Sequence, residues 1–149
     1  IYNTKSKKLK YTKKKCSIMS NYGKYALTRD DFTSDVSPVG VSLYQLTKSG
    51  MKKLKTLTKH GMTAHFINDS IYYINYPLDA GEEPSMRQME IYICDLDGGN
   101  AELVTTITDP SEYGYVQVME LNAGHCDLMM SDGEYRFIFD SKHLEKLKY

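Results

Sequence analysis

The residues most able to do chemistry in this chain are four histidines, three cysteines and a few clustered acids. His125 stands next to Cys126 in "GHCD", and a thiolate needs a neighbouring base or cation before it attacks a carbonyl. Adjacent residues of a strand point to opposite faces, so we expect this pair not to work together. The histidines fall in no metal-ligand spacing, and we expect surface or capping roles for them. They are His60, His65, His125 and His143.

The acidic stretch "DLDGGN" at 95–100 places carboxylates at alternate positions, as a calcium-binding loop does. Such a loop would need Gly where Asn100 stands and Glu where Thr106 stands. A tight hairpin turn explains the same residues, because Gly, Asn and Asp reach the positive φ that such turns require. Phosphate-binding Gly loops and nucleotide fingerprints are missing from the sequence as well. We therefore predict no catalytic residue, no metal site and no cofactor, and we predict that the chain is not an enzyme.

The three cysteines, Cys16, Cys94 and Cys126, are too few and too scattered for a disulfide framework or a zinc site. An odd number leaves at least one thiol unpaired within the chain. We expect buried or half-buried thiols that behave as small hydrophobic groups, and their redox state stays open.

Composition indicates one domain that is rich in strands. The chain has 149 residues with 13 Tyr and no Trp, and it holds no apolar run long enough to cross a membrane. Fourteen Lys or Arg face three Asp in residues 1–60, a balance of +11, and residues 61–149 balance at −11. Such a division can mark a polyanion-binding patch or simply solvated strands of different sign. We favour the second interpretation and predict no nucleic-acid partner and no membrane insertion.

A short motif returns along the chain: "KKLK" at 7–10 and 52–55, and "EKLK" at 145–148. Each copy follows an apolar strand and a polar turn, and Leu103 occupies the corresponding place in "GGNAELVTT". This pattern predicts the outer strand of a hairpin, with Leu inward and Lys in water. A second hairpin joins "GMTAHFIN" to "SIYYINYP" by a turn at Asn68 and Asp69. Four strands in about 45 residues is the period of a propeller blade.

The strand faces point to the same architecture. Ile71 and Tyr73 alternate with Tyr72 and Ile74, so both faces of this strand are apolar. A sheet packed on both sides reads in this way, and propeller blades are covered on both faces by their neighbours. We expect a single β-repeat region over 1–149, whose units are 1–15, 16–58, 61–108 and 113–149.

The segments "DSIYYINYP" at 69–77 and "MEIYICDLDGGNAELVTTITD" at 89–109 resemble a blade of the six-bladed propellers typified by the YWTD repeats of the low-density-lipoprotein receptor and by TolB-like repeats. The chain is similar in particular to bacterial, mostly secreted proteins with a receptor-like propeller domain of unknown function. This resemblance implies an extracellular or cell-envelope location. The predicted fold is all-β, with antiparallel four-stranded blades in about three and a half repeats of a larger ring.

Two stretches, "TSDVSPVG" at 33–40 and "PLDAGEEPSMRQ" at 77–88, lengthen the loop between the second and third strands of a unit. Loops carry function where a rigid scaffold presents them, and a tolerated insertion is the alternative. The candidate binding residues are Asp35, Ser37, Asp79, Glu82, Glu83 and Arg87. We predict a non-catalytic binding or scaffold module that presents these loops to a protein or glycan partner at the bacterial cell surface.

Three and a half blades do not close a ring, and the chain begins inside a repeat. We therefore expect either a homo-oligomer or a fragment of a longer polypeptide. The alternative fold is a β-trefoil, which closes as one domain. The alternative functions are part of a propeller enzyme, whose site missing blades would complete, and a trefoil lectin.

Overall fold

The computed structural model is built entirely of β-strands and turns in the part of the chain that it describes. It describes residues 2–3, 8–9, 16–30, 39–67, 69–78, 84, 88–108, 116–122, 125–130, 135–140 and 143–148. No helix in these ranges is long and apolar enough to cross a membrane. The predicted all-β antiparallel fold is therefore confirmed, including strand rather than helix over the closing "EKLK".

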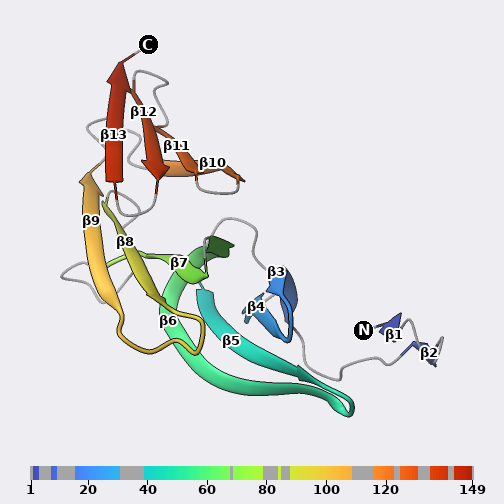
Figure 1. Cartoon of the computed structure of the whole chain (residues 1–149). Helices are drawn as coiled ribbons and strands as arrows, with labels where there is room; N and C mark the ends of the chain where they lie inside the picture. The colour runs from blue at the N-terminus through green and yellow to red at the C-terminus, as the bar shows by residue number, and fades with distance from the viewer. Residues whose placement is uncertain are drawn as a thin grey trace.

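In the described part of the chain, thirteen strands form three antiparallel sheets (Figure 1). The first sheet is a short hairpin, and the last is a four-stranded sheet in the C-terminal region where one was expected. The strands are β1 (Tyr2–Asn3), β2 (Lys8–Leu9), β3 (Ser17–Tyr22), β4 (Tyr25–Arg29), β5 (Val39–Thr47), β6 (Gly50–Ile67), β7 (Ser70–Asn75), β8 (Gln88–Asp95), β9 (Glu102–Thr108), β10 (Val116–Asn122), β11 (His125–Met130), β12 (Tyr135–Asp140) and β13 (His143–Lys148). Every sheet is ordered as in the sequence, so the described strands pair only with their chain neighbours.

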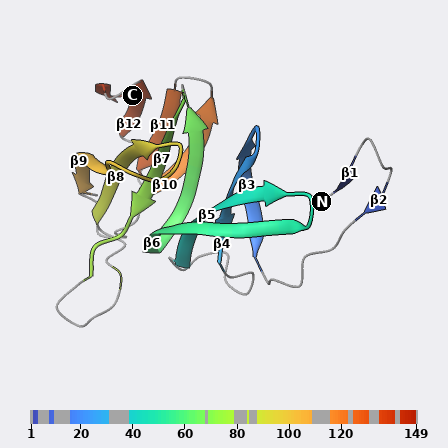
Figure 2. The same ribbon diagram turned by 60° about the horizontal axis from the view of Figure 1, so that its bottom comes forward.

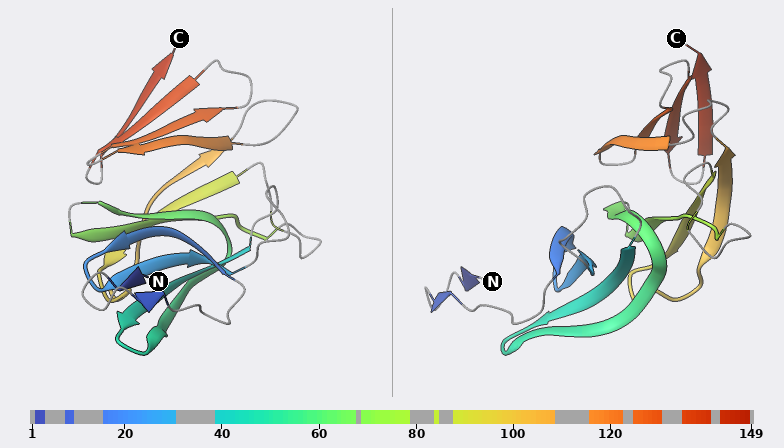
Figure 3. Two further views of the ribbon diagram at one scale, coloured as in Figure 1. Left: turned by 90° about the vertical axis from the view of Figure 1, so that its right-hand side faces the viewer. Right: turned by 180° about the vertical axis from the view of Figure 1, so that it is seen from behind.

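The middle sheet differs from expectation because it holds seven strands, β3 to β9, rather than two separate sheets over 16–58 and 61–108. The expected boundary, between residues 58 and 61, falls inside β6, which is one continuous strand of 18 residues. The first part of β6 pairs with β5 and the last part with β7. Figure 1 and both views of Figure 3 show β6 curving strongly as it passes from one neighbour to the other.

Gly61 is the residue at which β6 changes partners, since it pairs with Val39 on one side and Asn75 on the other. Register shifts flank it in both pairings, and such irregularities bend a strand and increase its twist. A Cβ at Gly61 would lie 2.6 Å from a methyl of Thr58 and 2.8 Å from the carbonyl oxygen of Ile74. The curl of the sheet therefore depends on a residue without a side chain.

Both faces of the central strands are buried, as predicted. Ile71, Tyr72, Tyr73 and Ile74 of β7 are all at most 6% exposed. The curled sheet has two arms, β3 to β5 on one side of β6 and β7 to β9 on the other. The hydrophobic core on one face packs these arms together. Its buried members are Leu27, Val41, Leu43, Ala64, Ile71, Tyr73 and Cys94.

The prediction that the repeated leucines point inward is wrong for the two whose side chains are described. Leu54 is 38% exposed, because it is the extra residue of a β-bulge between Lys53 and Lys55. Leu103 is 50% exposed on β9, which is the last strand of the seven-stranded sheet and has one neighbour in it. Both residues lie in the second strand of a hairpin. Leu103 is on an edge strand, as expected, but Leu54 is on β6, the middle strand of the seven.

We predict that Gly61→Ala lowers the free energy of unfolding by about 1–3 kcal/mol, because the added methyl overpacks the bend against a backbone oxygen and two side chains. Urea unfolding followed by circular dichroism measures the change. The control is Gly99→Ala, where the new methyl meets the movable carboxylate of Asp97. A Gly61→Ala protein as stable as the Gly99→Ala protein would show that the bend does not need glycine.

Candidate functional site

The six candidate binding residues all lie outside the described residues, but the strand ends that carry their loops are described. The 31–38 loop connects β4 to β5, and the 79–87 loop follows the end of β7 and precedes β8. We call the end of β4 with the start of β5 the first stem, and the end of β7 with the start of β8 the second stem. Their geometry determines where the two loops leave the sheet.

The two stems lie at the same end of the seven-stranded sheet. Val39 of the first stem pairs with Gly61, Gly61 pairs with Asn75 of the second stem, and Asn75 pairs with Glu90. These four residues form one row across β5, β6, β7 and β8. Neighbouring strands are about 4.8 Å apart, so the row spans about 14 Å. Both stems are on the same side in the left view of Figure 3, opposite the β5–β6 turn.

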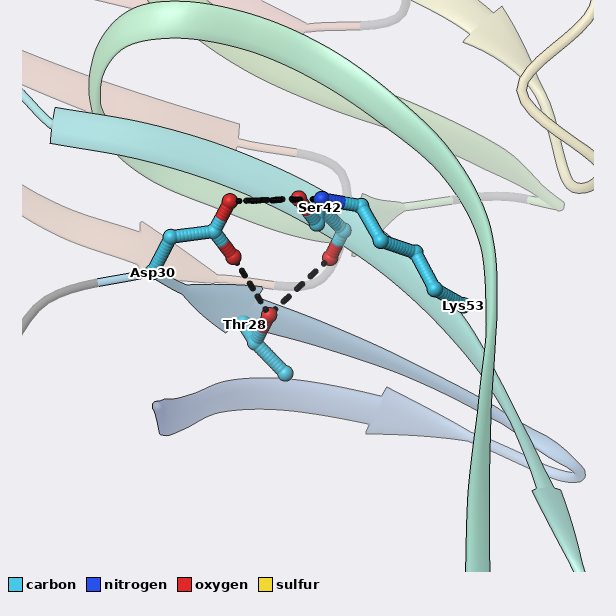
Figure 4. Close-up of polar contacts among 4 residues, drawn as sticks. All are labelled: Thr28, Asp30, Ser42 and Lys53. Carbon is cyan, nitrogen blue, oxygen red and sulfur yellow. Dashed lines mark hydrogen bonds and ion pairs between the residues drawn. The ribbon is translucent and has the colours of Figure 1, made fainter. Parts of the chain in front are cut away.

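The first stem is closed by a backbone hydrogen bond and a polar cluster. Asp30 N–H donates to the carbonyl oxygen of Gly40 at 2.8 Å, which brings the two ends of the loop together. The Ser42 hydroxyl donates to Oδ2 of Asp30 at 2.8 Å, and the Lys53 ammonium lies 3.5 Å from the same oxygen (Figure 4). The Thr28 hydroxyl lies 3.4 Å from the other carboxylate oxygen of Asp30.

Gly40 packs closely beside this carboxylate. A Cβ at Gly40 would lie 2.7 Å from Oδ2 of Asp30, so a larger residue would displace the acceptor of the Ser42 hydroxyl. Thr28 and Ser42 are fully buried, and a buried hydroxyl needs a partner. Because Ser42 has no exposed surface, its hydroxyl serves as a structural donor and not as a nucleophile.

The second stem is held by a line of polar side chains, which we call the polar ladder: Thr58, Asn75, Glu90 and Tyr92. The Thr58 hydroxyl donates to Oδ1 of Asn75 at 2.5 Å, and Nδ2 of Asn75 donates to Oε2 of Glu90 at 2.7 Å. The Tyr92 hydroxyl donates to the same oxygen of Glu90 at 3.3 Å. These bonds join β6, β7 and β8 beside the place where the chain leaves for the 79–87 loop.

Aromatic packing supports the polar ladder from the core side. The rings of Tyr73 and Tyr92 are stacked, with centroids 5.3 Å apart and planes at 9°. Burial raises the pKa of Tyr73 to about 12, so its hydroxyl stays protonated at neutral pH. At the far end of the second stem, Tyr76 is 1% exposed, and its N–H donates to the carbonyl oxygen of His60 at 2.8 Å.

The acidic stretch at 95–100 forms the predicted turn. Gly98 and Asn100 have φ values of 80° and 48°. Nδ2 of Asn100 donates to the Asp95 carboxylate at 2.7 Å, and the N–H of Gly99 donates to the Asp97 carboxylate at 2.7 Å. The carboxylates therefore bind groups of the turn itself. Among the described residues, His, Cys, Asp and Glu form no group of three that could hold a metal ion.

The cysteines whose side chains are described behave as expected. Cys94 is 3% exposed in the core and Cys16 is half-buried, and neither forms a disulfide bond. Burial raises the pKa of the Cys94 thiol to about 11. A thiol with so high a pKa holds little thiolate at neutral pH, so Cys94 is a packing residue. His125 and Cys126 both fall in β11, and their side chains lie outside the described part.

The sequence reasoning missed the residues that close the stems. Polar residues inside apolar strands were the available signal: Thr28 in "YALTR" and Ser42 in "VGVSLY". Asn75 directly after "IYYI" is a similar signal. Their partners Asp30, Lys53 and Glu90 could not be assigned to them, because the pairing depends on strand register.

We predict that Asp30→Ala lowers the free energy of unfolding by about 1–3 kcal/mol, because the buried Ser42 hydroxyl loses its acceptor. Ser42→Ala should cost less, and the double variant should lose less than the sum of the two by about 1 kcal/mol. Urea unfolding of the four proteins completes the cycle. Strictly additive losses would show that the two side chains do not interact.

His65 gives the fold a pH dependence. Burial lowers its pKa from 6.5, and its Nε2 lies 3.0 Å from the Thr63 hydroxyl. The unfolded chain therefore takes up the proton at a higher pH than the folded chain. The stability that neutral His65 contributes is complete above pH 6.5 and is lost as the pH falls through its lower folded-state pKa.

We predict that unfolding in urea becomes easier as the pH is lowered from neutral to mildly acidic values, and that His65→Gln reduces this dependence. The measurement is the midpoint of urea unfolding at several pH values for both proteins. Parallel curves for the wild type and the variant would contradict this role of His65.

No protein-family model matches this chain, and no curated protein matches it.

Proposed function

We propose that this chain is a non-catalytic binding module of an extracellular or cell-envelope protein, which presents the 31–38 and 79–87 loops to a protein or glycan partner. The observation that carries the proposal is the row of Val39, Gly61, Asn75 and Glu90, which sets both stems at one end of the sheet. A spacing of about 14 Å lets two loops contact one partner together.

The rigidity of the stems supports the same function. The first stem is closed at Asp30 and Gly40, and the second is fixed by the polar ladder and by buried Tyr76. Ordered strand ends reduce the entropy lost when loops bind a partner. The chemistry of the described residues fits binding better than catalysis, since Ser42 and Cys94 are both buried.

For the architecture, we propose that the seven-stranded sheet consists of two four-stranded propeller blades that share β6. The support is the change of partners at Gly61, with β3, β4 and β5 on one side and β7, β8 and β9 on the other. The two apolar faces of β7 fit a blade, which is covered by neighbours on both sides. A second copy or further sequence of the same polypeptide would complete the ring.

The test of the binding function uses the wild-type chain on an array of purified glycans and against a displayed peptide library. A loop variant carries alanine at the six candidate residues. A control variant carries alanine at Ser49 and Asp97, which lie in turns outside the stems. We expect the loop variant to bind the selected glycan or peptide at least tenfold more weakly, while the control binds like the wild type.

Equal losses in the two variants would contradict the assignment of the loops as the binding surface. Cleavage of the bound glycan or peptide by the wild-type chain would instead favour an enzyme.

A further inference from the structure

The β5–β6 hairpin carries the strongest concentration of positive charge among the described residues. Residues 36–68 contain no Asp or Glu, and five lysines lie between 48 and 59. All five are exposed, and exposed Lys24 lies beside the hairpin, where its carbonyl accepts a hydrogen bond from Leu46 N–H. The five are Lys48, Lys52, Lys53, Lys55 and Lys59.

Main-chain pairing leaves one edge of this segment open. β6 pairs with β5 up to Gly61, and β7 begins to pair only at Gly61. β5 stays paired with β4 up to Gln45, so among the described residues the open edge is the one on the β6 side before Gly61. The turn of the hairpin lies away from β7, β8 and β9 in Figure 2. Lysines and bulges on such an edge hinder the addition of another strand, which argues against an extended peptide as the occupant.

The lysines lie on both faces of the hairpin. The Lys53 ammonium is on the face of Asp30, at 3.5 Å from its carboxylate, and Lys55 reaches the carbonyl oxygen of Gly98 at 2.5 Å on the core side. Two cations on opposite faces do not fit a flat membrane, which would contact one face. Lys52 and Lys59 are about 17 Å apart along β6, because Leu54 and Leu57 are extra residues of bulges between them. A line of charges of this length matches a polymer with repeated anionic groups better than a single anion.

The residue types on the hairpin distinguish between polymers. Residues 48–59 contain no aromatic residue and no Arg. Proteins that bind single-stranded nucleic acid stack its bases on aromatic side chains, and base edges are read by the planar guanidinium of Arg. Lysine carries a compact positive charge, which can bind an anionic group without stacking or planar hydrogen bonds. We propose that the β5–β6 hairpin is a binding site for an anionic polysaccharide, held through its carboxylate, sulfate or phosphate groups.

This site is separate from the loops of the proposed function. β5 begins at the first stem and ends at the hairpin turn, so Lys48 and Lys52 lie at the opposite end of the strand from the stems, whereas Lys59 lies two residues from Gly61. A partner of the loops and a polysaccharide on the hairpin would occupy different ends of the molecule. Loss of one site should therefore leave the other intact.

The experiment measures binding of the full chain to fluorescent polygalacturonate and to dextran sulfate by anisotropy, with uncharged dextran of similar length as the neutral probe. The hairpin variant is Lys48→Glu with Lys52→Glu, two lysines at the turn end of the hairpin. The control variant, Lys146→Glu with Lys148→Glu, makes the same change of net charge outside the hairpin. Circular dichroism of each protein establishes that it is folded.

We expect both anionic polymers to bind and dextran not to bind. The hairpin variant should bind at least tenfold more weakly, and the control variant should change less than threefold. Raising the salt from low to physiological concentration should weaken wild-type binding by roughly tenfold or more, because a bound polyanion releases its counterions.

Three results would overturn the proposal: equal binding of dextran, equal losses in the hairpin and control variants, or tighter binding of a single-stranded oligothymidylate than of either polysaccharide. A hairpin variant that does not fold is replaced by Lys48→Gln with Lys52→Gln, for which the same comparison holds with a smaller expected loss of about threefold.

Discussion

The bend of β6 at Gly61 is the constraint on which the rest of the described sheet depends. A strand that bends sharply between two neighbours needs space for its backbone at the bend, and a glycine provides that space. Gly61 meets this condition, because Thr58, Val41 and the Ile74 carbonyl occupy the space of a Cβ. Through this bend the sheet curls and brings Leu27, Val41 and Leu43 against Ala64, Ile71 and Cys94.

The same bend places the two stems next to each other. Without the change of partners at Gly61, Val39 and Asn75 would not share a row, and the loops would leave from unrelated places. Hydrogen bonds between polar side chains then hold the two stems in these positions. Asp30 accepts from Ser42 at one stem, and Glu90 accepts from Asn75 at the other.

The local features of this chain could be predicted from its sequence, and the features that depend on register could not. The turn at 97–100, the hairpins and the two apolar faces of β7 follow from turn chemistry and alternation. The continuity of β6 and the exposure of Leu54 follow from bulges, where one strand holds an extra residue. A bulge leaves no clear mark in composition, and one extra residue reverses which side chains face the core. The contacts of Asp30 and Glu90 depend on that register, so they could not be predicted from the sequence either.

The described strands pair only with their chain neighbours, and this pattern bears on how the protein folds. Contacts between consecutive strands are short in sequence, and chains dominated by such contacts close small loops first and fold faster than those with distant pairings. A row of independent hairpins would also open one at a time. β6 works against that, because its residues belong to two sets of strands at once. Opening either set frays the strand that the other set needs, so the two arms of the curled sheet gain and lose their structure as one cooperative unit.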